Sequence, residues 1–144
     1  MEEGPALRAA ALIADRVAAD EADATLARER FKDGPLPSLE PDEHVVGHLT
    51  PGESVHDSRS RAILSGPGGE NALGYGGSLY LTSRRLVHLG QVSVTVRLTD
   101  IVETSLAGER LLLTLPEGEG MTLDVERPRH FRAQMAAAQR LLRQ

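Results

Sequence analysis

The chain has 144 residues, which suits one domain of common size, and apolar residues make up 40% of it. It has no Cys and no Trp, and only 3% of its residues are aromatic, which excludes disulfides, thiol catalysis and cysteine-bound zinc and argues against a stacking platform for single-stranded nucleic acid. The net charge of −5 argues against nonspecific binding to DNA or to an anionic membrane.

Residues 5–31 are predicted to form a helix, because Pro5 suits a first turn and the segment has no internal Gly or Pro. Its apolar face is poor, since Asp20 interrupts the stripe of Ile13, Val17, Ala24 and Phe31. Such a helix packs loosely on the domain, pairs with another copy or projects into solvent, and the sequence leaves these alternatives open. Residues 32–43, with Gly34 and three prolines, predict a linker.

From His44 onward the pattern is that of a β domain, so we divide the chain into an arm with its linker (1–43) and a domain (44–144). The most distinctive stretch is 76–90, GGSLYLTSRRLVHLG, in which two apolar runs flank a polar turn and predict a central hairpin. A flexible loop is expected at 65–74. Val45 and Val46 continue the β pattern before a turn at 50–52. The remaining strands are expected at 54–64, 92–98, 100–106, 111–115 and 121–125, several with apolar residues at every second position.

A second helix is expected to begin at Pro128. Phe131, Met135, Ala138 and Leu142 recur at i, i+4, i+7 and i+11, which places them on one helix face. Seven strands in two antiparallel sheets leave one end of a sandwich open, and this single apolar-faced helix is the natural cap. The sequence therefore predicts a mainly β fold with a capping C-terminal helix and an N-terminal helical arm.

Three short motifs resemble the bacterial branch of the pleckstrin-homology (PH)-like and GRAM-like domains. They are LTPGE at 49–53, GSLYLTSRRL at 77–86 and LTDI at 98–101. The resemblance covers about residues 45–143 and leaves the arm outside. It implies a seven-stranded antiparallel sandwich or barrel closed by the last helix, and a binding module rather than an enzyme.

The same resemblance suggests candidate anion sites. PH domains that hold phosphoinositides are similar in using basic residues on the first two strands and the loop between them. Here Arg59 and Arg61 lie two apart on the first strand, which predicts one face, and Arg84 and Arg85 at the hairpin tip form a second candidate. The joining loop has no Lys or Arg and contains the acidic Glu70.

The hairpin motif also has a structural interpretation, as an alternative to anion binding. Gly76 and Gly77 permit a bend, Thr82 and Ser83 can bond the turn backbone, and Arg85 is expected to pair with an acid such as Asp100.

Catalytic and metal-binding patterns are weak. His44 and His48 have the spacing of one helix face, but the surrounding Pro, Gly and Val residues predict a strand, in which they would lie about 13 Å apart, too far for one zinc ion. No G-x-S-x-G occurs, and GPGG at 66–69 and GYGG at 74–77 lack the order of phosphate-binding loops. We therefore predict no catalytic residue, no metal site, no cofactor and no nucleic-acid partner.

The predicted function is a non-catalytic adaptor that binds protein or itself. An open strand edge can accept another strand. Residues 1–57 carry 13 acids and 5 bases, whereas residues 58–144 carry 8 acids and 11 bases, so the acidic arm of one copy could pair with the Arg-rich last helix of another. The alternative is peripheral binding to anionic, phosphoinositide-type membrane surfaces. With no signal peptide and no stretch of roughly 20 apolar residues, we expect a cytoplasmic protein, in the alternative peripheral at the inner membrane.

Overall fold

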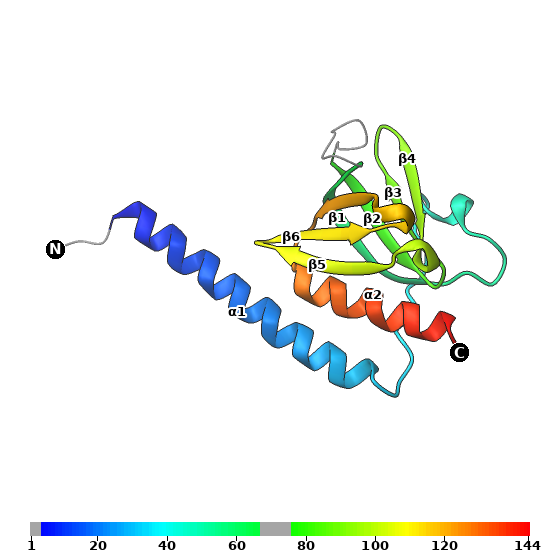
Figure 1. Ribbon diagram of the computed structural model, residues 1–144, viewed down its shortest axis with the longest axis horizontal. Helices are drawn as coiled ribbons and strands as arrows, with labels where there is room; N and C mark the ends of the chain where they lie inside the picture. The colour runs from blue at the N-terminus through cyan, green and yellow to red at the C-terminus, as the bar shows by residue number, and fades with distance from the viewer. Residues whose placement is uncertain (1–3, 67–75) are drawn as a thin grey trace.

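The computed structural model describes residues 4–66 and 76–144. A helix, seven strands and a second helix follow one another in the predicted order, and both helices have the predicted starting residues (Figure 1). Three short 3₁₀ turns that the sequence did not predict lie between them in the described ranges. The elements are α1 (Pro5–Phe31), η1 (Val46–His48), β1 (Val55–Ser65), β2 (Gly77–Thr82), β3 (Arg85–Leu89), β4 (Ser93–Arg97), η4 (Leu98–Asp100), β5 (Glu103–Ala107), β6 (Arg110–Thr114), η5 (Pro116–Gly118), β7 (Gly120–Asp124) and α2 (Pro128–Leu142).

The strands form one antiparallel, bent sheet in the order β4-β3-β2-β1-β7-β6-β5. β1 pairs with β2 through residues 55–62 and with β7 through residues 63–65. The register shifts between Arg59 and Ala62, and Arg61 has a φ of 58°; irregularities of this kind bend a strand. β1 therefore belongs to both halves of the sheet, the β2–β3 hairpin is central as predicted, and β4 and β5 are the two edges.

α2 closes the open end of the bent sheet, as predicted. The side-chain amide of Gln139 donates to the carbonyls of Leu98 and Ile101, both at 3.0 Å, which fixes α2 beside η4. The main core lies between α2 and the two halves of the sheet. Its largest fully buried side chains are those of Phe131, Leu64, Leu79, Leu81, Leu86, Leu98, Leu111, Leu113, Leu123 and Met135.

A second, smaller cluster covers the outer face of β2 and β3. Val45, Val55, Tyr80 and Val87 are buried there. The Tyr80 hydroxyl donates to Asp42 Oδ2 at 2.7 Å, and burial together with this hydrogen bond raises the pKa of Tyr80 to about 12. The segment before β1 is therefore tied to the sheet.

Local differences from the predicted elements have identifiable causes. Val46 belongs to the 3₁₀ turn η1 and not to a strand, because Asp42 Oδ1 accepts the backbone N–H groups of His44 and Val45 and starts a turn. Residues 98–100 form η4 and delay the next strand to Glu103. Most of the loop predicted at 65–74 falls outside the described residues.

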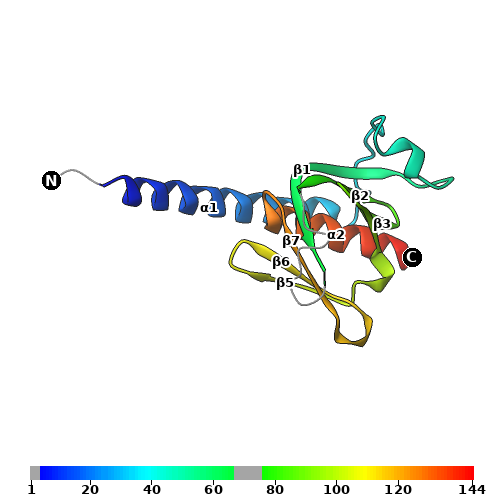
Figure 2. The same ribbon diagram turned by 90° about the horizontal axis from the view of Figure 1, so that it is seen from above.

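The two halves of α1 have different surroundings. Asp20, Ala24, Ala27 and Phe31 are buried against α2, whereas residues 5–16 are all exposed. In both views α1 extends well beyond the domain (Figures 1 and 2). The arm thus packs on the domain with one half and projects with the other. No helix in the described part of the chain is long and apolar enough to span a membrane.

Candidate functional site

The hairpin tip is organised by a buried ion pair between Glu53 and Arg85. Arg85 donates Nε–H to Glu53 Oε2 at 2.9 Å and Nη2–H to Oε1 at 3.0 Å, and it also donates to the carbonyl of His48. Glu53 further accepts the Thr82 hydroxyl at 2.6 Å and the Thr50 backbone N–H at 2.9 Å. The Glu53 side chain is 0% exposed, so both carboxylate oxygens are satisfied inside the protein.

These contacts settle the ionisation of Glu53. Burial alone would raise its pKa, but the hydrogen bonds from Arg85, Thr82 and Thr50 outweigh burial and lower the pKa to about 2. The expected pairing of Arg85 with Asp100 is wrong: Asp100 binds Arg97 at 3.0 Å. Glu53 was visible only as part of the LTPGE motif, and its partner lies 32 residues away.

Arg59 is held just as firmly, at the junction of β1 and α2. Its side chain is 10% exposed and lies over the ring of Phe131, 5.3 Å from the centroid. It donates to Asp57 at 2.7 Å and to Gln134 at 3.1 Å. Burial and nearby arginines lower the pKa of His130, whose Nδ1 lies 2.9 Å from Arg59 Nη2. Arg59 therefore fastens α2 to the sheet.

The other two candidate arginines remain on the surface. Arg84 is exposed in the β2–β3 turn and donates to the Thr50 hydroxyl at 2.6 Å. Arg61 is exposed within the irregular part of β1. Because the register shifts after Arg59, the two-residue spacing does not make Arg59 and Arg61 a pair of free cations. The structure thus separates the four candidates into two structural and two exposed arginines.

Two of the histidines line the same hollow beside the hairpin. His44 and His48 line an open hollow of about 400 Å³ with Ser78, and His56 is engaged elsewhere, with Nδ1 2.9 Å from the carbonyl of Pro37. Over the described ranges, no three His, Asp or Glu side chains are grouped as a metal ion would need.

Asp20 has an unexpected role at the start of α2. α2 has no side-chain cap of its own, and Arg127 precedes Pro128 in a left-handed conformation. Asp20 of α1 supplies the missing acceptor: its carboxylate accepts the backbone N–H of Arg129 at 2.8 Å and that of His130 at 3.1 Å. A carboxylate at a helix N-terminus satisfies free N–H groups and complements the helix dipole.

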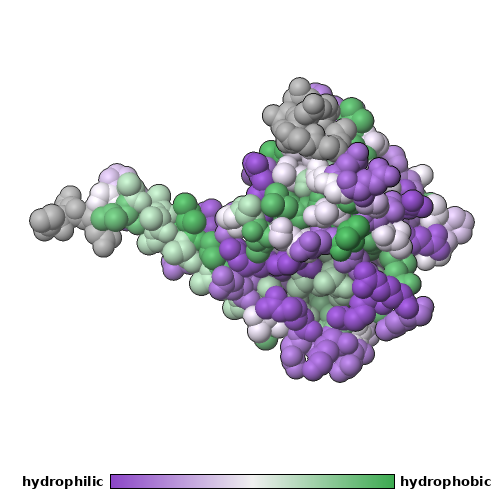
Figure 3. All heavy atoms as spheres, in the orientation of Figure 1, coloured by the Kyte–Doolittle hydropathy of each residue, from purple (hydrophilic) through white to green (hydrophobic). Residues whose placement is uncertain are grey.

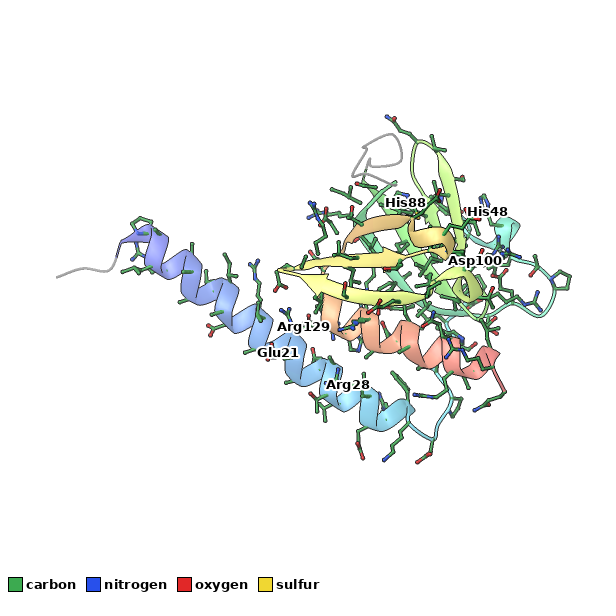
Figure 4. The ribbon with its side chains drawn as sticks, in the orientation of Figure 1. Glu21, Arg28, His48, His88, Asp100 and Arg129 are labelled. Atoms are coloured by element: carbon green, nitrogen blue, oxygen red, sulfur yellow. The ribbon has the colours of Figure 1, made fainter. Side chains whose placement is uncertain are left out.

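Ion pairs extend this contact between the helices. Asp23 binds Arg127 at 2.9 Å, and Glu21 lies 3.6 Å from Arg129. Figure 4 shows Glu21 on α1 and Arg129 on α2 near each other. The attraction between acidic arm and basic C-terminal helix, which we expected between copies, is thus made within one chain. Asp20 interrupts the apolar stripe of α1 in the sequence, but it does not interrupt the packing of α1 on α2. It faces the N-terminus of α2 and binds two of its backbone N–H groups.

No family model matches the chain, and no curated protein matches it. Among solved structures, the chain is similar to one described as "Vps36 N-terminal PH domain", with a TM-score of 0.57 and 18% identity over 67% of this chain and 86% of that chain. At this identity the likeness concerns the fold. With the seven-stranded sheet and its closing helix, it shows that the chain has a PH-like fold.

Proposed function

We propose that this chain is a non-catalytic cytoplasmic binding module of PH-like type that associates with protein, either a different partner or a second copy. The observation that carries the proposal is a contrast between the arginines of the candidate anion sites and the apolar residues of the arm. Arg59 and Arg85, two of the four arginines of the candidate anion sites, are bound by side chains of the same chain. Of the nine large apolar residues that are exposed in the described part of the chain, four lie on α1, and these four, Leu7, Leu12, Ile13 and Leu26, are each more than half exposed.

Several buried polar groups also support a binding role over catalysis. Glu53, Asp20 and His56 each have structural hydrogen-bond partners, and their geometry serves the fold. A closer relation to the bacterial GRAM-like branch is part of the proposal and rests on the motifs at 49–53, 77–86 and 98–101.

Photo-crosslinking tests the association with protein. A photoreactive residue replaces Leu7, which is 62% exposed on the arm, or Leu39 as an exposed control in the linker, and the full chain is irradiated in cells. Protein adducts at Leu7 and not at Leu39 support the proposal, whatever their mass. Adducts with lipid alone, or none, contradict it.

Peripheral binding to anionic membranes is the second candidate, favoured by the exposure of Arg61 and Arg84. Flotation with phosphatidylcholine vesicles and with vesicles that also contain phosphatidylserine, at roughly 0.15 M salt, separates the two functions. We expect no flotation. Flotation with anionic vesicles that is lost in Arg61→Ala/Arg84→Ala, and retained in the charge-matched Arg97→Ala/Arg143→Ala, would establish the membrane function instead.

A further inference from the structure

One seam, apolar except at Asp20, runs along the whole of α1. Eight positions follow alternating spacings of four and three residues, which puts them on one helix face. They are Ala6, Ala10, Ile13, Val17, Asp20, Ala24, Ala27 and Phe31. The last four are buried against α2. The first four continue the same seam beyond the point where α2 begins.

The register between the helices shows where the seam loses its partner. α2 runs parallel to α1 with a constant offset, because Asp20 binds the backbone of Arg129 and the carbonyl of Phe31 accepts from Arg140, both 109 residues apart. The first residue of α2, Pro128, therefore lies beside Ala19. The preceding residues 5–18 form about 21 Å of helix at 1.5 Å per residue, with no helix of the described chain beside them.

This projecting half is unusually apolar for an exposed helix. Of residues 5–19, only Arg8, Asp15 and Arg16 are charged, and at 100° per residue the three fall within one sector of about 100°. Ile13 on the seam is 56% exposed. Figure 3 shows apolar side chains along this half of the helix. A face of this kind is typical of a helix that packs against another.

We propose that the projecting half of α1 packs against the same segment of a second copy, antiparallel and related by a two-fold axis. With Ala10 opposite the partner's Ile13, Ala6 lies opposite the partner's Val17. Each large side chain then meets an alanine, and symmetry repeats both contacts. The inference rests on the proposed association with protein and names its surface and partner.

The neighbouring positions fit this register as well. Leu7 and Ala14 flank the seam on one side, and Ala9 and Arg16 on the other, so an antiparallel pair brings no like charges together across it. An antiparallel pair also places the two globular domains at opposite ends, whereas a parallel pair would force them together.

The structure provides room for the tip of the partner helix. A groove of about 660 Å³ lies where the arm leaves the domain. Its apolar lining comes from Ile13, Val17, Ala19, Val125 and Pro128, and its charged lining comes from Arg16, Asp20, Asp23, Glu109, Glu126 and Arg127. In the antiparallel register the partner's first helical turn, around Ala6, reaches Val17 and enters this groove. The groove and the seam share Ile13 and Val17, so one helix can occupy both.

Sedimentation velocity of the full chain tests the proposal, with Ile13→Glu and Leu12→Glu as a matched pair. The two residues are adjacent and 56% and 59% exposed, but only Ile13 lies on the seam. An interface this small predicts weak, reversible dimerisation. We expect Ile13→Glu to raise the dissociation constant at least tenfold and Leu12→Glu to leave it unchanged. A wild-type chain that stays monomeric up to several hundred micromolar, or equal effects of the two substitutions, would overturn the proposal.

Cross-linking checks the direction of the helices. The chain has no cysteine, so Ala10→Cys and Ile13→Cys chains can be mixed and oxidised. Antiparallel pairing predicts heterodisulfides between the two variants, whereas Ala10→Cys homodimers would contradict it. If the wild type is monomeric while photo-crosslinking at Leu7 still yields protein adducts, the partner is a different protein and the proposed function stands without this inference. Flotation with neutral vesicles that Ile13→Glu abolishes would identify a lipid surface as the occupant and overturn the inference.

Discussion

Replacing Glu53 by Gln should strongly destabilise the fold, although it changes only one non-hydrogen atom. The amide cannot accept from Arg85 through both ends, and it leaves the guanidinium, itself 19% exposed, beside a neutral group. Breaking a buried ion pair on one side costs about 3–5 kcal/mol. The pKa of Glu53, lowered from 4.5 to about 2, gives a similar figure: 2.5 units at 1.36 kcal/mol each correspond to about 3 kcal/mol.

The pH dependence of this loss follows from the direction of the shift. The folded-state pKa lies below the unfolded value, so between pH 4.5 and 2 the unfolded chain binds a proton that the folded chain does not. The stability that Glu53 contributes is complete above pH 4.5 and is lost as the pH falls through 2. The difference between wild type and Glu53→Gln should therefore shrink from about 3 kcal/mol at pH 7 to about 1 kcal/mol at pH 3.

Urea unfolding with an unchanged m-value is the assay. Asp100→Asn is the control, because it breaks the solvent-exposed pair with Arg97 and should cost about 1 kcal/mol or less. Adding Arg85→Met to Glu53→Gln should recover part of the loss by removing the unpaired charge. If Glu53→Gln costs no more than Asp100→Asn, or if the difference does not change with pH, the hydrogen-bond geometry described for Glu53 is not what stabilises the hairpin.

Two further substitutions test other parts of the fold. Asp20→Ala removes the acceptor at the start of α2 and should cost about 2 kcal/mol, with faster hydrogen exchange at the amides of Arg129 and His130; unchanged exchange there would contradict the capping role. Gly77→Ala places a Cβ 2.5 Å from the carbonyl oxygen of Leu89 and should cost about 1–3 kcal/mol in thermal unfolding, whereas the adjacent Gly76→Ala has no atom of the described chain within 4 Å and should be nearly neutral; equal melting temperatures would contradict the close packing of the two strands.

Helices and strands were predictable from the sequence wherever one face of the element is buried along its whole length. Alternation at Met121, Leu123 and Val125 predicted β7 because one face of that strand is buried. The same alternation does not hold at Arg59 and Arg61, because an irregularity in β1 shifts the register between Arg59 and Ala62. No local sequence pattern indicates this shift. The spacing of apolar residues indicates which face of a regular strand is buried. It no longer does so where the backbone is irregular.

The candidate site was harder to predict because its contacts are remote in sequence. From the sequence, several carboxylates were equally plausible partners for Arg85. Only the three-dimensional path of the chain brings Glu53 next to it. In the sequence, Asp20 only interrupted the apolar face of the predicted helix at 5–31. One signal was available: the sequence before α2 reads Glu126-Arg127-Pro128 and offers no Ser, Thr, Asp or Asn at the usual capping position, which left room for an acceptor from another element.

The pairing of α1 with α2 has a consequence for synthesis of the protein. α1 is made first, and the helix that covers half of its seam begins 97 residues after it ends, from Phe31 to Pro128. At about 5–20 residues per second, a nascent chain spends roughly 5–20 s with Ala24, Ala27 and Phe31 uncovered. A ribosome-bound chain that stalls before Pro128 would keep the entire seam available to neighbouring nascent chains on the same messenger RNA.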